Sequence, residues 1–409
     1  MNLEARQEKM SGRKVSVVVP SYNHEKFILK ALNSVVRQTY KDYEIVLLDD
    51  ASSDCSVERI DEFIAAHPEI PCRRYVHAQN KGGVITLNEL IQHAQGEYIA
   101  LINSDDIWDD NKLELQVHYL DQHPEVGAVF TQAVFVDNND QLLTDTVGFP
   151  SHLFKQRNRS RGQWLRRLFY ELNCFCHPSI LIRKSVYDEI GLYDPRLRQL
   201  PDFQMWIRLI KQREIHIIEK PLVQLRIHKA NTSKITVETI SRNLNEMTYI
   251  FTEFFDGIPD DVLIDGFGDH FRNPNATTPN ELACEKAFLY FTPDFVFKSL
   301  YSHIGLQKLF ALLAKPEINE VLAQQYKFDY DAFFALNGVK FLDELLLSPS
   351  FLFARPPGVK DLEDLQPSSF TLRYFVAMNR RFIGLYLRRY PAIFHPMAKL
   401  WSIVRTRFH

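Results

Sequence analysis

The feature that most constrains the fold is a set of three apolar runs, each followed by polar or acidic residues. The runs are residues 15–19, 45–48 and 98–102. Continuous runs of this kind, rich in β-branched residues, are typical of parallel strands that are buried on both faces. Ligands of an open α/β sheet bind just past the carboxyl ends of its strands. We therefore expect the polar residues that follow the runs, Asn23, Asp50 and Asp106, to line one crevice.

The segments between the runs have apolar residues at the spacing that is typical of helices. Apolar residues recur every three or four positions over residues 25–38 and again over residues 81–94, before Gly96. Further strand-like runs follow at residues 126–136, 179–183, 215–218 and 223–227. Alternating strands and helices predict a parallel sheet with right-handed crossovers. The fold class is therefore α/β, with a mostly parallel central sheet flanked by helices.

The pattern changes near residue 241, beyond which helix-compatible segments rich in Phe, Leu and Tyr follow. A chain of 409 residues is also too long for one ordinary core. We predict an α/β domain over residues 1–240, a helical domain without an assigned role over residues 241–370, and a basic tail over residues 371–409.

Charge is distributed unevenly. Residues 365–409 contain eight Lys and Arg and no Asp or Glu, so the rest of the chain carries 40 basic and 51 acidic residues. An acidic body argues against general nucleic-acid binding. Five scattered cysteines fit a reducing compartment; Cys174, Cys176 and His177 lack a second pair at zinc-site spacing. With no visible signal peptide or long apolar run, we expect a cytoplasmic protein.

The end of the chain has the pattern of a basic amphipathic helix. Over residues 372–389, apolar and aromatic residues share one side of a helical wheel, and Arg373, Arg380, Arg381 and Arg388 share the other. Such a helix can lie on the inner face of the cytoplasmic membrane, which is anionic. The same pattern also fits a helix that packs on the protein body, so both interpretations stay open.

Asp105 and Asp106 end the third run and form the strongest local signal for chemistry. Mg²⁺ and Mn²⁺ typically bind one or two protein carboxylates together with phosphates. A strand-terminal acid pair can also serve as a helix cap, but here it follows two other polar strand ends. The three ends together suit a nucleoside diphosphate that is carried with a divalent cation.

Several ordered motifs resemble those of the family 2 glycosyltransferases. They lie at residues 16–23, 38–40, 46–53, 96–98 and 104–106. The resemblance spans roughly residues 14–235. It implies the GT-A fold, an inverting hexosyltransferase, a nucleotide-sugar donor, and Mn²⁺ or Mg²⁺ as the metal.

The resemblance assigns the nucleotide pocket residue by residue. Pro20, Tyr22 and Asn23 match its first wall, and Asp50 matches the acid that accepts the N3–H of uracil. A carboxylate suits that donor, and it would equally suit thymine or guanine. Asp50 could instead cap the next helix, and Tyr22 could simply pack.

The metal and the diphosphate are assigned in the same way. Asp105 matches the residue that contacts the ribose and sugar region, and Asp106 matches the metal ligand. His228 matches a residue that reaches the metal or the diphosphate, and a neutral histidine is a competent metal ligand. Arg226 or Lys229 would add positive charge there.

Asp202 matches the general base of the family, four residues before Trp206 on an expected helix. The chemistry requires a base, because a sugar hydroxyl is a poor nucleophile until its proton is removed. An aspartate after proline is otherwise a common helix N-cap. His177 and Trp206 match the acceptor side of the site.

Two departures from the family pattern stand out. Many relatives carry an acid where this chain has Asn103, and an arginine where it has Leu87. Losing that arginine removes one phosphate contact, for which Lys81 is the expected substitute. Neither departure touches the expected metal ligand or base.

The resemblance and the basic tail together imply transfer of a sugar, most naturally from a UDP-sugar, to a saccharide or lipid-linked saccharide. The setting would be bacterial surface polysaccharide synthesis, such as O-antigen or capsule. Two alternatives stay open: a sugar nucleotidyltransferase, which usually has a glycine-rich basic loop after the first strand, and an inactive binding or scaffold protein.

Overall fold

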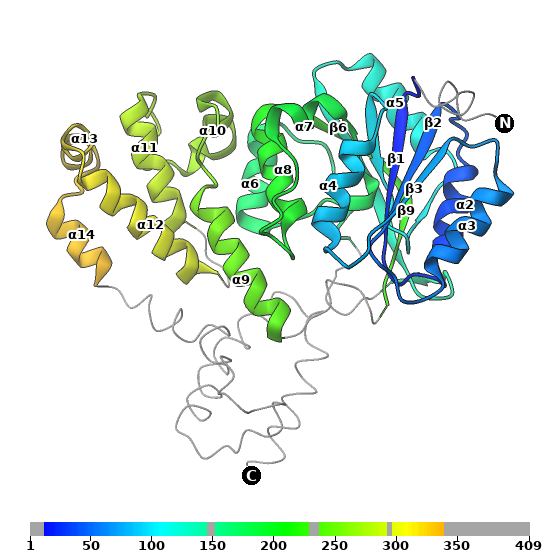
Figure 1. The fold of residues 1–409 in the computed structure, drawn as a ribbon. Helices are drawn as coiled ribbons and strands as arrows, with labels where there is room; N and C mark the ends of the chain where they lie inside the picture. Colours follow the sequence, from blue (N-terminus) through cyan, green and yellow to red (C-terminus); the bar gives the residue numbers. More distant parts are fainter. Residues whose placement is uncertain (1–11, 145–151, 229–236, 293–296, 339–409) are drawn as a thin grey trace, which may run out of the picture. The chain divides into compact units, whose positions relative to one another are not determined.

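The computed structural model describes residues 12–144, 152–228, 237–292 and 297–338 (Figure 1). Contacts divide the chain into two compact units, of which the first comprises Met1–Thr144 with Ser151–Thr232 and the second comprises Asp145–Pro150 with Ser233–His409. The expected domain limit at residue 240 and the expected tail over residues 371–409 remain predictions, and the tail lies outside the described residues.

A nine-stranded mixed sheet forms the centre of the first unit, in the order β3-β2-β1-β4-β8-β6-β9-β5, with β7 paired to β6. The strands are β1 (Val15–Ser21), β2 (Tyr43–Asp49), β3 (Cys72–Val76), β4 (Tyr98–Leu101), β5 (Ile107–Trp108), β6 (Val126–Val136), β7 (Leu142–Leu143), β8 (Leu181–Arg183) and β9 (Glu214–Arg226). The first four strands are parallel, whereas β8 runs antiparallel to both β4 and β6. The predicted α/β class, with a mostly parallel sheet flanked by helices, is confirmed.

Helices cover both faces of the sheet (Figure 1). They are α2 (Ile28–Val36), α3 (Ser56–Ala66), α4 (Gly83–His93), α5 (Lys112–Gln122), α6 (Arg161–Glu171), α7 (Lys184–Ile190) and α8 (Pro201–Gln212). Alternate residues of β1, such as Val17 and Val19, pack with α2, α3 and α5 in one apolar core. Helix α4 contacts β1 and β2 from the other face. Residues of a strand alternate between faces, which is why continuous apolar runs are needed here.

The two strands predicted at residues 215–218 and 223–227 are a single strand, β9. The pairing of β6 with β9 shifts register on both sides of Gln132, which lies opposite Pro221. Proline has no N–H to donate, so a ladder can accommodate it at an irregularity of this kind. The gap between the two predicted strands therefore corresponds to a bulge or irregularity within the single strand β9.

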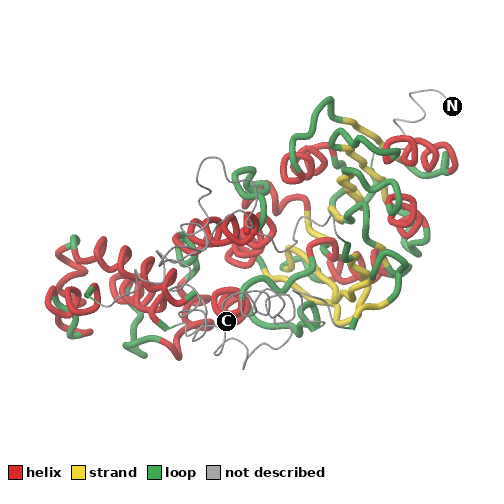
Figure 2. The backbone as a smooth tube through the Cα atoms, turned by 90° about the horizontal axis from the view of Figure 1, so that it is seen from below, coloured by secondary structure: helices red, strands yellow, loops and turns green. Residues whose placement is uncertain are grey.

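The second unit consists of helices and loops in its described part (Figure 2). The helices are α9 (Val237–Thr252), α10 (Asp260–Phe267), α11 (Pro279–Phe288), α12 (Lys298–Leu313), α13 (Pro316–Tyr326) and α14 (Tyr330–Asn337). Helix α11 begins with a capping box between Thr278 and Glu281. Among the described residues, no helix combines the length and the apolarity needed to cross a bilayer.

Candidate active site

The loops after β1 and β2 are bonded to each other at the carboxyl edge of the sheet. Asn23 has a left-handed backbone, with φ of 54°, and its amide N–H donates to Ser52 Oγ over 2.8 Å. The Asn23 side chain accepts from the Ser53 N–H over 2.8 Å. Tyr22 is 46% exposed beside this junction, whereas Pro20 is part of β1, opposite Leu48. Asn23 thus shapes the crevice wall through two contacts with the β2 loop.

Three contacts within the protein hold the Asp50 carboxylate. It accepts from the backbone N–H groups of Lys81 and Gly82, each over 2.8 Å, and lies 2.7 Å from His77 Nδ1. The side chain does not cap α3, whose first turn has no side-chain cap. The Lys81 ammonium lies 2.9 Å from Glu89, so its charge is partly balanced inside the protein.

Asp106 is buried and both of its carboxylate oxygens are engaged by the protein. Oδ1 accepts from the Arg226 backbone N–H over 2.9 Å, and Oδ2 accepts from Asn103 Nδ2 over 3.0 Å. Burial and the neighbouring charge of Asp105 raise the pKa of Asp106 well above its usual value, against the opposing effect of these hydrogen bonds. Asn103 is therefore a donor to Asp106.

Asp105, rather than Asp106, lies with histidines in an arrangement that fits a cation. His24, Asp105 and His228 each offer one possible ligand atom, and these three atoms lie within 4.8 Å of one another. His228 Nε2 is 2.9 Å from Asp105 Oδ2, and His24 Nδ1 is 2.7 Å from Ser104 Oγ. Burial lowers the pKa of His24, despite the nearby Asp105 charge, which favours the neutral ring that a metal requires.

Arg226, expected to add positive charge to the diphosphate region, is instead used within the protein. Its side chain is fully buried, donates to the Asp105 carbonyl over 2.8 Å and pairs with Asp140 at 2.6 Å. The guanidinium also lies over the Phe27 ring at 4.8 Å. Arg226 therefore braces the backbone of the acid pair. Lys229 lies outside the described residues.

Asp202 lies in the first turn of α8, at a partly exposed position, after Pro201. Its Oδ1 accepts from the Phe203 N–H over 2.8 Å, and its Oδ2 accepts from Asn173 Nδ2 over 2.9 Å. The N-cap position of α8 belongs to Leu200, so Asp202 does not cap the helix. Asn173 fixes the orientation of the carboxylate.

The residues expected on the acceptor side form an aromatic cluster behind Asp202. Trp206 is fully buried, with its ring centroid 5.5 Å from His177 and 6.4 Å from Tyr193. His177 Nε2 lies 3.0 Å from the Tyr193 hydroxyl, and burial lowers the pKa of His177 to about 3. His177 is therefore neutral near pH 7, and Trp206 supports it from within.

Cys174 and Cys176 are buried thiols. Burial raises the pKa of the Cys176 thiol well above its usual value. The charges of Asp106 and Asp202 act in the same direction, whereas Lys112 and a hydrogen bond with Ser179 act against it.

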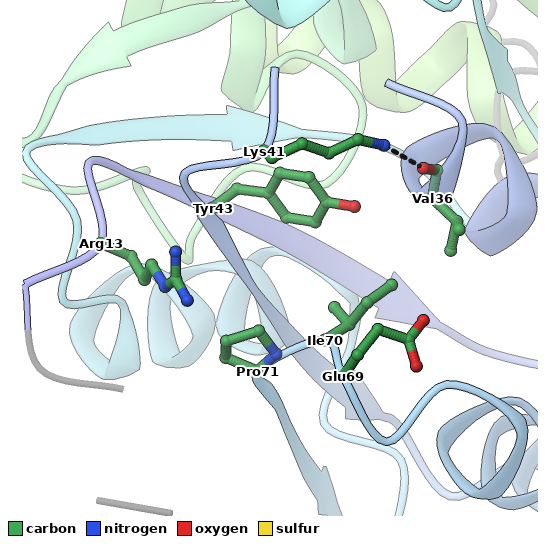
Figure 3. Close-up of a pocket in the computed structure, with 7 residues that line it drawn as sticks. All are labelled: Arg13, Val36, Lys41, Tyr43, Glu69, Ile70 and Pro71. Atoms are coloured by element: carbon green, nitrogen blue, oxygen red, sulfur yellow. Dashed lines mark hydrogen bonds between the residues drawn. The ribbon is translucent and has the colours of Figure 1, made fainter. Parts of the chain in front are cut away.

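A separate cavity of about 240 Å³ lies at the opposite edge of the sheet (Figure 3). It is lined by Arg13, Val36, Lys41, Tyr43, Glu69, Ile70 and Pro71. These residues surround the amino ends of β1, β2 and β3, whereas ligands of open sheets bind past the carboxyl ends. Its cations are already engaged, Arg13 with Asp42 and Lys41 with the Val36 carbonyl. It is not part of the candidate active site.

Comparison with known proteins shows the family of the chain. The family model described as Glycosyl transferase family 2 matches residues 16–191. The glycosyltransferase EpsE of Bacillus subtilis is 30% identical over 207 residues, which cover 49% of this chain and 68% of EpsE. The chain belongs to the family 2 glycosyltransferases and has the GT-A fold.

Two further similarities are more limited in what they show. An uncharacterised glycosyltransferase of Rickettsia conorii is 28% identical over 295 residues, which cover 67% of this chain but 44% of that protein. The crystal structure of S. aureus TarS aligns with a TM-score of 0.50 and 17% identity, over 81% of this chain and 54% of TarS. The chain therefore spans about half the length, or less, of these two proteins, and the TarS likeness concerns the fold alone.

Three side chains that the structure brings to the site were not predicted from the sequence. His24 joins Asp105 and His228, His77 contacts Asp50, and Asn173 contacts Asp202. Only His24 had a local signal, because it lies in the turn directly after a predicted strand. The other two lie 27 and 29 positions from their partners.

Proposed function

We propose that this glycosyltransferase moves a sugar from a UDP-sugar to a hydroxyl of a saccharide acceptor, with inversion at the anomeric carbon. The observation that carries the proposal is the cluster of His24, Asp105 and His228 at the edge of the sheet where Asp50 also lies. The reaction has two requirements. The first is a site that binds the diphosphate of the nucleotide, and the second is a group that accepts the proton of the acceptor hydroxyl. Asp202 supplies the second.

Asp105, His24 and His228 would hold a divalent cation, with Asp105 replacing Asp106 as the carboxylate ligand. Asp106 is buried and held by a hydrogen bond to each of its oxygens, whereas Asp105 faces the two imidazoles. Two nitrogen donors favour Mn²⁺ over Mg²⁺, which prefers oxygen. When bound, the cation supplies positive charge for the diphosphate leaving group.

Asp202 would act as the general base. Its carboxylate takes the proton of the acceptor hydroxyl while the acceptor oxygen bonds to the anomeric carbon, and the bond from that carbon to the diphosphate breaks with its electron pair. The Asn173 amide, which donates to Oδ2, keeps the carboxylate oriented before the acceptor binds. One displacement converts an α-linked donor into a β-linked product.

Residue chemistry supports the proposed donor and acceptor. The Asp50 carboxylate suits the N3–H of uracil. Tyr22 and Asn23 would form the wall beside the nucleotide, and His177 would face the acceptor. The basic amphipathic pattern of residues 372–389 supports an acceptor at an anionic membrane, such as a lipid-linked saccharide of surface polysaccharide synthesis.

The test is transfer from a panel of UDP-, dTDP- and GDP-sugars with Mn²⁺, using the wild-type chain, Asp202→Asn and the control Asp188→Asn. Asp188 is exposed on α7. Asp202→Asn should lower the turnover at least about 10²-fold, the usual scale of general-base catalysis, while UDP affinity stays unchanged. Unchanged turnover in this variant would overturn the assignment of Asp202, and release of pyrophosphate from a nucleoside triphosphate would favour a nucleotidyltransferase.

A further inference from the structure

His77 and Asp50 are neighbours because the sheet brings together the ends of two parallel strands. β2 and β3 are paired so that Asp49 lies opposite Val76, and the next residue of each strand is Asp50 and His77. The His77 backbone N–H donates to the Asp49 carbonyl over 2.9 Å. The contact between the two side chains is therefore built into the register of the sheet.

Contacts with the described residues leave one acceptor position on the Asp50 carboxylate. A carboxylate offers about four acceptor positions, two on each oxygen. On Asp50, Oδ1 faces the Lys81 N–H and His77 Nδ1, and Oδ2 accepts from the Gly82 N–H. The remaining position on Oδ2 is the one that can receive a base N–H. Asp50 is 3% exposed, so its direction is set by these contacts.

Both ring nitrogens of His77 face carboxylates. Nδ1 lies 2.7 Å from Asp50 Oδ1, and Nε2 lies 2.8 Å from Glu89 Oε2 on α4. The ring is 7% exposed. A neutral imidazole has one N–H, so only the doubly protonated ring can donate to both carboxylates. Lys81 Nζ, 2.9 Å from the other Glu89 oxygen, is the remaining charge that faces this group.

We propose that His77 is a positioning residue, which as an imidazolium between Asp50 and Glu89 holds the 77–82 loop and directs Oδ2 of Asp50 at the nucleotide base. The proposal rests on the proposed function, because it deepens the role of Asp50 in base recognition. His77 itself touches no substrate. It acts through Asp50, and its charge balances the two carboxylates that a nucleoside diphosphate would otherwise meet.

The sign of the pH effect follows from the contacts of His77. Burial lowers its pKa, but the hydrogen bonds to Glu89 and Asp50 outweigh burial, and the net shift is upward. The imidazolium therefore persists to a higher pH than an ordinary histidine. When the pH rises through the raised pKa, one N–H is lost and the pocket gains negative charge, so nucleotide binding should weaken.

Two substitutions distinguish the contacts of His77. The amide of His77→Asn can replace Nδ1–H toward Asp50, whereas the longer His77→Gln reaches Glu89 and leaves Asp50 without that donor. UDP affinity, measured by calorimetry with Mn²⁺, should stay within about threefold in the first variant and fall about tenfold in the second, the scale of one charged hydrogen bond. His118→Asn, an exposed position on α5, is the control.

Two further measurements separate positioning from simple support of the fold. Between about pH 6 and about pH 9, the UDP affinity of the wild type should fall about three- to tenfold relative to that of His77→Asn, in which the proposed metal ligands are unchanged. N3-methyl-UDP, which lacks the base N–H, should bind wild type and His77→Gln equally. Side-chain ¹⁵N NMR should show His77 doubly protonated at about pH 7.

The outcomes are distinct. A neutral His77 at about pH 7, or equal UDP affinity and equal pH slope in all variants, would overturn the inference alone. No UDP binding by the wild-type chain at any pH would overturn the proposed donor, and the positioning role with it.

Discussion

Replacing each member of the acid pair by asparagine tests which aspartate serves the metal and which serves the fold. Asp106 accepts one hydrogen bond on each oxygen, from the Arg226 N–H and from Asn103 Nδ2. In Asp106→Asn one of these donors meets an NH₂ group instead of an oxygen. A buried donor left without an acceptor costs about 1–3 kcal/mol.

Part of that cost is offset, because the substitution also removes a buried carboxyl group beside Asp105. We expect a net destabilisation of about 1–2 kcal/mol, which lowers the melting temperature of a unit of this size by about 2–8 °C. Mn²⁺-dependent UDP affinity should stay within about threefold, a change of less than about 1 kcal/mol.

Asp105→Asn should give the opposite result. The variant removes a charged oxygen ligand from the cluster with His24 and His228, and it relieves the repulsion between the two acids. Its melting temperature should match or exceed that of the wild type. Mn²⁺-dependent UDP affinity should fall at least about tenfold, which corresponds to about 1.4 kcal/mol.

Thermal unfolding and calorimetry with UDP and Mn²⁺ measure the two effects separately. Asp110→Asn is the matched control, because Asp110 is exposed and its partner Arg37 is exposed as well. Loss of Mn²⁺-dependent binding in a folded Asp106→Asn protein, together with normal binding in Asp105→Asn, would refute this assignment of the pair.

Three further predictions concern other parts of the chain. In Gly96→Ala the new Cβ would lie 2.6 Å from the Ser16 backbone nitrogen, which cannot move freely. Thermal unfolding should show that the free energy of unfolding falls by about 1–3 kcal/mol or more. An unchanged melting temperature would contradict this prediction. Hydrogen bonds from the Thr278 and Thr277 N–H groups lower the pKa of Glu281 to about 2, and Glu281→Ala should therefore cost about 1 kcal/mol near pH 7. That difference in unfolding free energy should shrink as the pH falls from about 4 toward about 2, because the Glu281 carboxylate becomes protonated in the folded protein and its stabilising contribution is lost. A difference that stays constant with pH in denaturant titrations would show that the charge of Glu281 does not contribute to stability. Truncation before Pro367 should reduce partition into anionic liposomes in sedimentation assays, whereas equal partition would remove the membrane proposal.

The architecture of the first half could be predicted because its signals are local. The parallel strands β1, β2 and β4 are buried on both faces, so their sequences are mostly apolar runs, and each run is followed by polar residues. The antiparallel strand β8, which lies between β4 and β6 in the sheet, was harder to predict. It has three residues, and so short a sequence does not indicate in which direction the strand runs. The break in β9 at Pro221 was misleading for a related reason: a register shift is a property of two strands and cannot be seen in one.

The segments that form the site could be predicted from the sequence, but the contacts between their side chains could not. Asp105 and Asp106 are adjacent and chemically identical, and their roles are set by groups from distant parts of the chain. The Arg226 N–H, 120 positions away, occupies one oxygen of Asp106, and His228, 123 positions from Asp105, lies against Asp105. The end of β9 therefore brings both groups to the acid pair: the Arg226 backbone holds Asp106 inside the protein, and the His228 ring contacts Asp105. A motif of two acids predicts where a cation site can form; in our proposal, the register of β9 against the 103–106 turn decides which of the two acids binds the cation.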